Sequence, residues 1–172
     1  EIGKNVPNRL VGGFDDEFQG DMVPRVTYMG NPYSCAFSGK ALTFFSSRNL
    51  ASPELVEQRN IEERIDSVFY SDEYAAAIVR NTNGEYGSRL EVYKKDGTHV
   101  LSKEFNFEYT HADFDGDLII LYNEDSCRIY NMSGTEKFDA TFDFPVSKIR
   151  KGRFPGTLVV TGPQQMQELK LR

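Results

Sequence analysis

A sixteen-residue pattern that occurs twice constrains the fold more than any other feature of this chain. Residues 90–105 read LEVYKKDGTHVLSKEF and residues 127–142 read CRIYNMSGTEKFDATF, so the copies start thirty-seven residues apart. Aligned without a gap, they match Tyr93 with Tyr130, Gly97 with Gly134, Thr98 with Thr135 and Phe105 with Phe142. In each copy two alternating apolar and polar runs flank a turn candidate, Asp96-Gly97 or Ser133-Gly134. Each copy therefore predicts a β-hairpin, with a two-residue turn of type I′.

The pattern is part of a longer repeat. Both copies follow a segment that predicts a strand, a polar turn and an apolar strand: IDSVFYSDEYAAAIVRN before the first and YTHADFDGDLIILYNED before the second. The unit is thus four strands, and it starts near residues 26, 65, 109 and 146, at intervals of 39, 44 and 37. A period of about 40 residues with four strands per repeat is typical of a β-propeller blade.

The expected fold is all-β, a β-propeller-like domain with about four blades of four antiparallel strands. We expect one partial domain over residues 1–172, with approximate blades at 26–64, 65–108, 109–145 and 146–172. An antiparallel sandwich also has short, closely spaced strands. The second strand of each unit, such as AAAIVR or LIILYN, is almost continuously apolar. This favours the propeller, in which a middle strand is covered on both faces.

Two segments are ambiguous. Residues 52–65, SPELVEQRNIEERI, contain many helix formers, but their place in the repeat predicts an outer strand. The last unit ends after its third strand, while NRLVGGF, residues 8–14, is an extra strand ahead of the first blade. That strand either completes the last blade of a closed four-bladed ring or belongs to an upstream blade. In the second case residues 1–172 are about half of a larger propeller, and the start at EIGKN, without Met, favours a piece of a longer chain.

Bulk composition excludes some classes of function. A net charge of -6 and a pI of about 5.0 argue against non-specific nucleic-acid binding, which requires basic surface. No run of 18 apolar residues is present, so no segment is predicted to span a membrane. Cys35 and Cys127 lie in apolar stretches and are expected to be buried free thiols, although a disulfide stays open.

Four stretches resemble the C-terminal portion of an uncharacterised family found mainly in Gram-positive gut and soil bacteria. They are GDMVPRVTYMGNPYSCAF, RIDSVFYSDEYAAAIV, LEVYKKDG and FNFEYTHADFDGDLIILYNEDSCRIYNMSGTEKF. The family's members resemble WD40-like or quinoprotein-like propellers behind one N-terminal membrane anchor. The likeness covers roughly residues 20–172 and consists of packing and turn residues, while the anchor and first blades are absent here. It implies a propeller located outside the cytoplasm, on the cell surface or membrane-anchored in the full-length protein, but no activity, cofactor or site.

One acidic segment has the spacing of a calcium loop. In DFDGDLIILYNED, Asp113, Asp115, Asp117 and Glu124 occupy positions 1, 3, 5 and 12 of an EF-hand pattern. Leu118 stands where that loop needs glycine, and the apolar run predicts a strand that carries Glu124 away. A more loosely held ion, bound by Asp113, Asp115 and Asp117 alone, is the metal hypothesis that stays open, beside an ordinary acidic turn.

No other motif predicts catalysis or a cofactor. His99 follows the first hairpin turn and is expected to be solvated, whereas His111 begins an inner strand. Cys127, His111 and Asp113 are residue types that occur in catalytic triads, but any protein of this size offers such a combination. No zinc-ligand spacing or phosphate loop is present. The basic segment SKIRKGR, residues 147–153, is either a solvated loop or a contact for an anionic partner such as teichoic acid or a lipid headgroup.

Two alternative functions are consistent with these sequence features. The first is a non-catalytic platform whose loops bind a protein, a peptide or a cell-envelope polymer. The second is an enzyme or a cofactor-binding or metal-binding propeller, with Asp66, His111 and Asp113 converging on a central channel. The absence of a catalytic signature favours the first. A half-ring would also leave an apolar blade face bare, so self-association or pairing with a missing upstream half is expected.

Overall fold

The structure is a computed structural model that describes residues 25–81 and 85–171, and every regular element in these ranges is a β-strand. The first sheet contains β1 (Arg25–Tyr28), β2 (Tyr33–Phe37), β3 (Ala41–Ser46) and β4 (Glu54–Asn60). The second contains β5 (Ile65–Tyr70), β6 (Tyr74–Arg80), β7 (Ser88–Lys94) and β8 (His99–Phe105). The third contains β9 (His111–Asp115), β10 (Leu118–Tyr122), β11 (Ser126–Asn131) and β12 (Glu136–Thr141). The fourth contains β13 (Lys148–Lys151), β14 (Thr157–Thr161) and β15 (Met166–Lys170).

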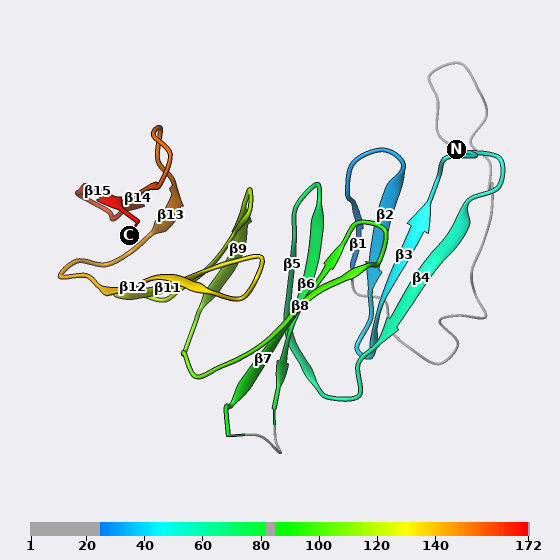
Figure 1. The fold of residues 1–172 in the computed structure, drawn as a ribbon, viewed down its shortest axis with the longest axis horizontal. Helices are drawn as coiled ribbons and strands as arrows, with labels where there is room; N and C mark the ends of the chain where they lie inside the picture. Colours follow the sequence, from blue (N-terminus) through cyan, green and yellow to red (C-terminus); the bar gives the residue numbers. More distant parts are fainter. Residues whose placement is uncertain (1–24, 82–84, 172) are drawn as a thin grey trace.

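Each sheet is built from consecutive antiparallel strands, and the sheets lie side by side like the blades of a fan (Figure 1). The first and fourth sheets are at opposite ends of this row. The all-β, propeller-like fold expected from the repeat is confirmed, and the described part of the chain forms an open arc instead of a closed four-bladed ring. The predicted extra strand at residues 8–14 lies outside the described residues.

Three apolar interfaces hold the arc together. The first interface lies between the first and second sheets, the second interface between the second and third sheets, and the third interface between the third and fourth sheets. The strand β6 shows how: Ala76 and Ile78 face the third sheet, while Ala75, Ala77 and Val79 face the first. Successive side chains of a strand point to opposite faces, so a strand inside a blade needs apolar residues at every position. This is the physical reason for the continuous apolar runs in the sequence.

The two copies of the repeated pattern form the β7–β8 and β11–β12 hairpins, which occupy equivalent places in neighbouring sheets. Gly97 and Gly134 have φ of 82° and 79°, and both pairs of strands shift register at the same point of the repeat. The type I′ prediction is wrong, because among the described residues only glycines have positive φ. Each glycine instead follows the turn, at the bulge position of a three-residue loop.

The segment at residues 52–65 is the strand β4 and not a helix, as its place in the repeat predicts. Its pairing with β3 shifts register between Phe44 and Phe45, and its charged side chains lie on the outer strand of the sheet. Cys35 and Cys127 are both free and buried, one in the first interface and one in the third.

Candidate functional site

The acidic turn and the basic segment noted in the sequence face each other across the third interface. Lys148 Nζ lies 3.1 Å from Asp113 Oδ2, and Arg150 Nη1 lies 3.5 Å from the same oxygen. The backbone N–H of Lys151 donates to Asp115 Oδ2 at 2.7 Å, and Lys151 Nζ pairs with Asp117. This hydrogen bond from Lys151 lowers the pKa of the Asp117 carboxyl.

These pairs change the interpretation of both segments. The three carboxylates bind groups of the fourth sheet, and the described residues contain no cluster of three or more potential metal ligands. The EF-hand interpretation is wrong, because β10 runs between the turn and Glu124. An ion at Asp113, Asp115 and Asp117 stays a prediction, and such an ion would have to displace Lys148, Arg150 and Lys151. Lys148–Lys151 of the basic segment form the strand β13 and not a loop, and three of their cations pair with these carboxylates, while contact with an anionic partner stays a prediction.

The residues proposed to converge on a channel have separate partners. Asp66 pairs with Arg80 at 3.2 Å and with Arg64 at 3.3 Å. His111 stacks on Tyr122, with ring centroids 4.7 Å apart, and its Nδ1 lies 2.9 Å from Thr110 Oγ1. Asp113 binds the cations of β13 described above. We find no contact that joins Asp66, His111 and Asp113 into one site.

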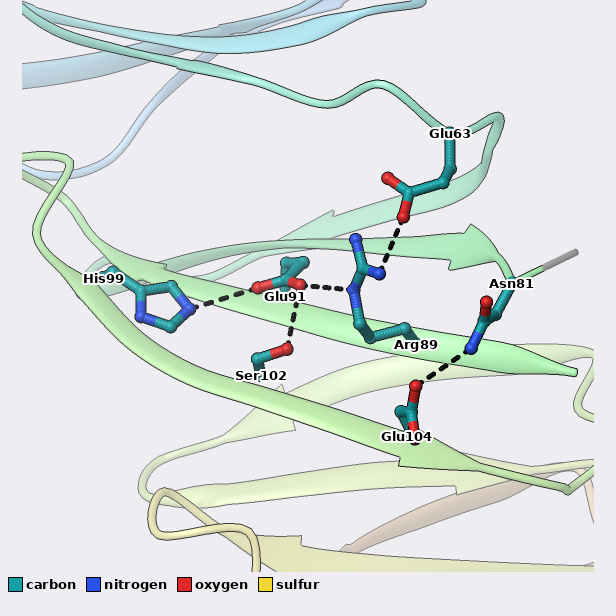
Figure 2. A network of polar contacts seen from close by, with 7 residues as sticks. All are labelled: Glu63, Asn81, Arg89, Glu91, His99, Ser102 and Glu104. Carbon is teal, nitrogen blue, oxygen red and sulfur yellow. Dashed lines mark hydrogen bonds and ion pairs between the residues drawn. The ribbon is translucent and has the colours of Figure 1, made fainter. Parts of the chain in front are cut away.

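A polar network that the sequence interpretation missed lies at the first interface, and Figure 2 shows it from close by. Its centre is Glu91 on β7, which is only 9% exposed. Glu91 Oε1 accepts hydrogen bonds from Arg89 Nε at 2.6 Å and from Ser102 Oγ at 2.9 Å. Glu91 Oε2 lies 3.1 Å from His99 Nε2.

Arg89 connects this network to the segment that joins the first two sheets. Its Nη1 lies 2.7 Å from Glu63 Oε1. This hydrogen bond raises the pKa of Arg89 and lowers the pKa of Glu63. The strand alternation explains the inward carboxylate: Leu90 and Val92 pack towards the third sheet, so Glu91 between them points to the first. In the sequence, the only sign of this network was the glutamate of LEVY, Glu91, which is a charged residue between two apolar ones.

The network lines a cavity of about 530 Å³ between β4 and the β7–β8 hairpin. Its geometry does not match nucleophilic catalysis, because Ser102 and His99 bind the same carboxylate instead of each other. His99 is exposed, as expected, with 46% of its side chain accessible, and its ring also packs edge-on against Tyr93 at 5.4 Å. The network therefore joins two sheets and is not arranged as a catalytic centre.

A second cavity, of about 900 Å³, opens between the second and third sheets. It lies at the end of the sheets that carries the β6–β7 and β10–β11 turns and the β8–β9 connection, which we call the loop end. The residues that line it are Asp66, Ser67, Arg80, Ser88, Phe107, Glu108, Tyr109, Thr110, Asn123, Glu124 and Asp125.

This loop-end cavity is acidic and has a fixed aromatic wall. Four of its lining side chains are carboxylates, and Arg80, which pairs with Asp66, is the one cation among the described residues that line it. Glu108 and Glu124 form no ion pair with any other described residue. Tyr109 Oη lies 2.7 Å from Ser67 Oγ, and burial raises the pKa of the Tyr109 hydroxyl. The cavity is thus suited to a cationic group with an apolar stem.

Solved structures with the same fold are very distant in sequence. A computationally designed protein, Ika4, matches with a TM-score of 0.56 and 7% identity, over 90% of this chain and 94% of that one. Hsv2 of Kluyveromyces lactis matches with a TM-score of 0.52 and 9% identity, over 89% of this chain and 47% of that one. BBS1N, solved in complex with ARL6DN, matches with a TM-score of 0.55 and 8% identity, over 88% and 52%.

At such identities the likeness shows the fold alone. Hsv2 and BBS1N are β-propellers, and this chain spans about half the length of either. The described part of the chain contains no helix with the length and hydrophobicity needed to cross a bilayer. A comparison with curated proteins finds no match. The profile of one family matches residues 1–171, and the chain therefore belongs to DUF5711, a family of unknown function.

Proposed function

We propose that this arc of blades is a non-catalytic platform whose loop-end cavity binds a cationic segment of a protein. The excess of carboxylates in that cavity carries the proposal, because Arg80 is already paired with Asp66 while Glu108 and Glu124 are available. Phe107 and Tyr109 offer apolar surface for the methylene stem of a lysine or arginine.

The other polar clusters support a binding role over catalysis. The Glu91 network and the Asp113 and Asp117 pairs each join neighbouring sheets, so their charges are used within the fold. BBS1N, a propeller with a similar arc, is described in complex with another protein. A cell-envelope ligand would fit the same cavity only if it carried cationic groups, since an anionic polymer is repelled by the carboxylates.

Charge reversal at the cavity tests the proposal. The probe is a fluorescent octalysine peptide, and its fully acetylated form is the uncharged control. The double variant Glu108→Arg and Glu124→Arg is expected to weaken octalysine binding at least tenfold. The matched variant Asp72→Arg and Glu136→Arg makes the same change of charge at the opposite end of the sheets, in the β5–β6 turn and at the start of β12, and is expected to bind normally.

Equal binding by the two double variants would refute a site at the loop end. Native mass spectrometry of the purified protein addresses the alternative of a cofactor-binding or metal-binding propeller. A small molecule or ion retained at a stoichiometry of one would contradict the non-catalytic platform.

We further propose that the platform works outside the cytoplasm, on the cell surface or held by a membrane anchor of the full-length protein. The resemblance to anchored bacterial propellers is the support for this location. Protease treatment of intact cells should degrade a tagged full-length protein while a cytoplasmic marker survives. Protection of the tagged protein would place it inside the cell instead.

A further inference from the structure

The hydroxyl of Tyr93 on β7 is buried but has no hydrogen-bond partner among the described residues. Tyr93 is only 6% exposed, and burial raises the pKa of its hydroxyl. It lines the cavity of about 530 Å³ at the first interface, which we call the first-interface cavity. Its ring packs on Phe44 and His99, with centroids 6.1 Å and 5.4 Å away. These contacts fix the ring and leave the hydroxyl unused, and a buried polar group in that state normally binds water or a ligand.

The equivalent tyrosine of the next blade does have a partner. Tyr130 occupies the same position of the repeat and is 1% exposed. Burial raises the pKa of its hydroxyl, and a hydrogen bond with Arg128 opposes that rise. In the repeat, Arg128 stands where the second sheet has Glu91, whose oxygens are bound by other side chains. Packing of neighbouring blades therefore does not require the free hydroxyl that Tyr93 presents.

The two arginines that line this cavity keep N–H groups that no described residue binds. Arg89 donates from Nε to Glu91 and from Nη1 to Glu63, and Figure 2 shows its other terminal nitrogen without a partner among the residues drawn. Arg59 donates from Nε to the carbonyl of Gly97 at 2.9 Å. A guanidinium has five N–H donors in a rigid plane, so each arginine holds unused donors in a fixed direction.

The charges around the first-interface cavity favour a neutral, polar ligand. Its described lining contains three carboxylates and two guanidiniums: Glu62, Glu63, Glu91, Arg59 and Arg89. The excess of carboxylates repels an anion, while a cation would find two of the three carboxylates already bound to Arg89. Of the ten described residues that line the cavity, only Ile61 has a wholly apolar side chain. A hydroxyl group both donates and accepts hydrogen bonds, so it suits guanidinium, tyrosine and carboxylate groups together.

We propose that the first-interface cavity is a second binding site, which takes a neutral sugar unit of an oligosaccharide, and that Tyr93 and Arg89 hydrogen-bond the sugar hydroxyls. The volume of about 530 Å³ lies within the range of small-ligand sites, roughly 300–1,000 Å³. Both sheets that form the cavity have four described strands, so the site does not depend on any further blade. It is separate from the loop-end cavity, which opens between the second and third sheets.

Removal of single hydroxyl groups tests the site. The probes are three neutral trisaccharides, maltotriose, cellotriose and triacetylchitotriose, each titrated by saturation-transfer NMR. At least one should bind the wild type, and Tyr93→Phe should raise its dissociation constant about tenfold, because one hydrogen bond in a buried site is lost. The matched control Tyr130→Phe removes the equivalent hydroxyl of the next blade and should bind the sugar as the wild type does.

Thermal unfolding without sugar separates binding from a structural role. Tyr93→Phe should keep the wild-type melting temperature, because its hydroxyl has no partner within the described fold. Tyr130→Phe should lower the melting temperature, because it loses the hydrogen bond with Arg128. A lower melting temperature for Tyr93→Phe alone would show that the Tyr93 hydroxyl supports the fold and would overturn its assignment to the sugar.

Two further comparisons define the ligand class and its place. Trigalacturonate, an anionic trisaccharide, should bind at least tenfold more weakly than the neutral sugar because of the excess carboxylates. The loop-end variant Glu108→Arg with Glu124→Arg should bind the sugar normally, since that cavity is a different one. The proposal is overturned if no neutral trisaccharide binds at about 10 mM, or if Tyr93→Phe and Tyr130→Phe bind equally well. Stronger binding of the acetylated octalysine peptide, lost in Tyr93→Phe, would instead assign the cavity to a peptide.

Discussion

The first and third interfaces bury comparable apolar clusters but place their charges differently. At the first, Glu91 is 9% exposed and its two oxygens are bound by three side chains. At the third, the side chain of Asp117 is 75% exposed and that of Lys148 is 43% exposed. A buried carboxylate has lost its hydration and depends on its protein partners, whereas an exposed ion pair is screened by water and salt. The two interfaces should therefore respond very differently to loss of a charge.

The largest effect is expected for Glu91→Ala at the first interface. Removal of the carboxylate leaves Arg89 partly buried without one of its partners and deprives Ser102 and His99 of theirs, so the free energy of unfolding should fall by about 3 kcal/mol. Guanidinium denaturation measures the change. The apolar interface loses local stability too, so thiol labelling of Cys35 should accelerate more than labelling of Cys127. Equal acceleration at both thiols would show that the network does not act on the first interface in particular.

The next effect concerns two glycines with positive φ. A Cβ at Gly97 would lie 2.5 Å from the Cβ of Glu57 on the neighbouring sheet, whereas nothing lies within 4 Å of a Cβ at Gly156. Gly97→Ala should therefore cost about 3 kcal/mol, from the left-handed backbone and the steric overlap together. Gly156→Ala, with φ of 71°, should cost only the backbone contribution of about 1 kcal/mol. Similar losses for both would mean that the turn does not pack tightly on the first sheet.

The exposed pairs of the third interface should contribute little. Lys148→Ala or Lys151→Ala is expected to lower the free energy of unfolding by less than about 1 kcal/mol. The loss should disappear in about 1 M salt, where the screening length falls to roughly 3 Å. Urea denaturation at low and high salt checks this. A large loss of unfolding free energy that does not depend on salt would contradict this, because it would show that these charges depend on their protein partners as Glu91 does.

The smallest effect is the pH dependence of the Glu63–Arg89 pair. The hydrogen bond from Arg89 lowers the folded-state pKa of Glu63 below its ordinary value of 4.5. The pair's contribution is therefore fully present above pH 4.5 and is lost as the pH falls through the folded-state pKa. The difference in stability between the wild type and Glu63→Gln should shrink as the pH is lowered from 6 to about 3. A difference that stays constant over that range would show that the pair contributes nothing through its charge.

The sequence predicted the strands well because their signals are local. The alternation around Gly97 and Gly134 and the apolar run of β6 follow directly from which faces a strand must bury. The turn type was wrong, because an Asp-Gly pair is compatible with more than one loop and the bulge between Val92 and Tyr93 depends on pairing with β8. The choice of strand over helix for β4 rested on the repeat and not on residue propensities.

The candidate sites were predicted much less well. Asp113 and Lys148 were each noticed, but as a metal ligand and as part of a basic loop, because nothing local says that they meet across two sheets. Glu91 was passed over as one member of an alternating strand. Its partners Glu63, His99 and Ser102 come from other segments, and only their convergence makes a charged residue acceptable in that place.

By itself, the sequence determined the order of the described strands and the faces that they bury, since period-2 patterning and glycine turns act over a few residues. Only the tertiary structure decided which charges pair, where the cavities open and that the described sheets form an open arc. The physical reason is the sequence range of the interactions. Strand patterning depends on residues close together within one blade, whereas ion pairs and cavities arise where neighbouring blades meet.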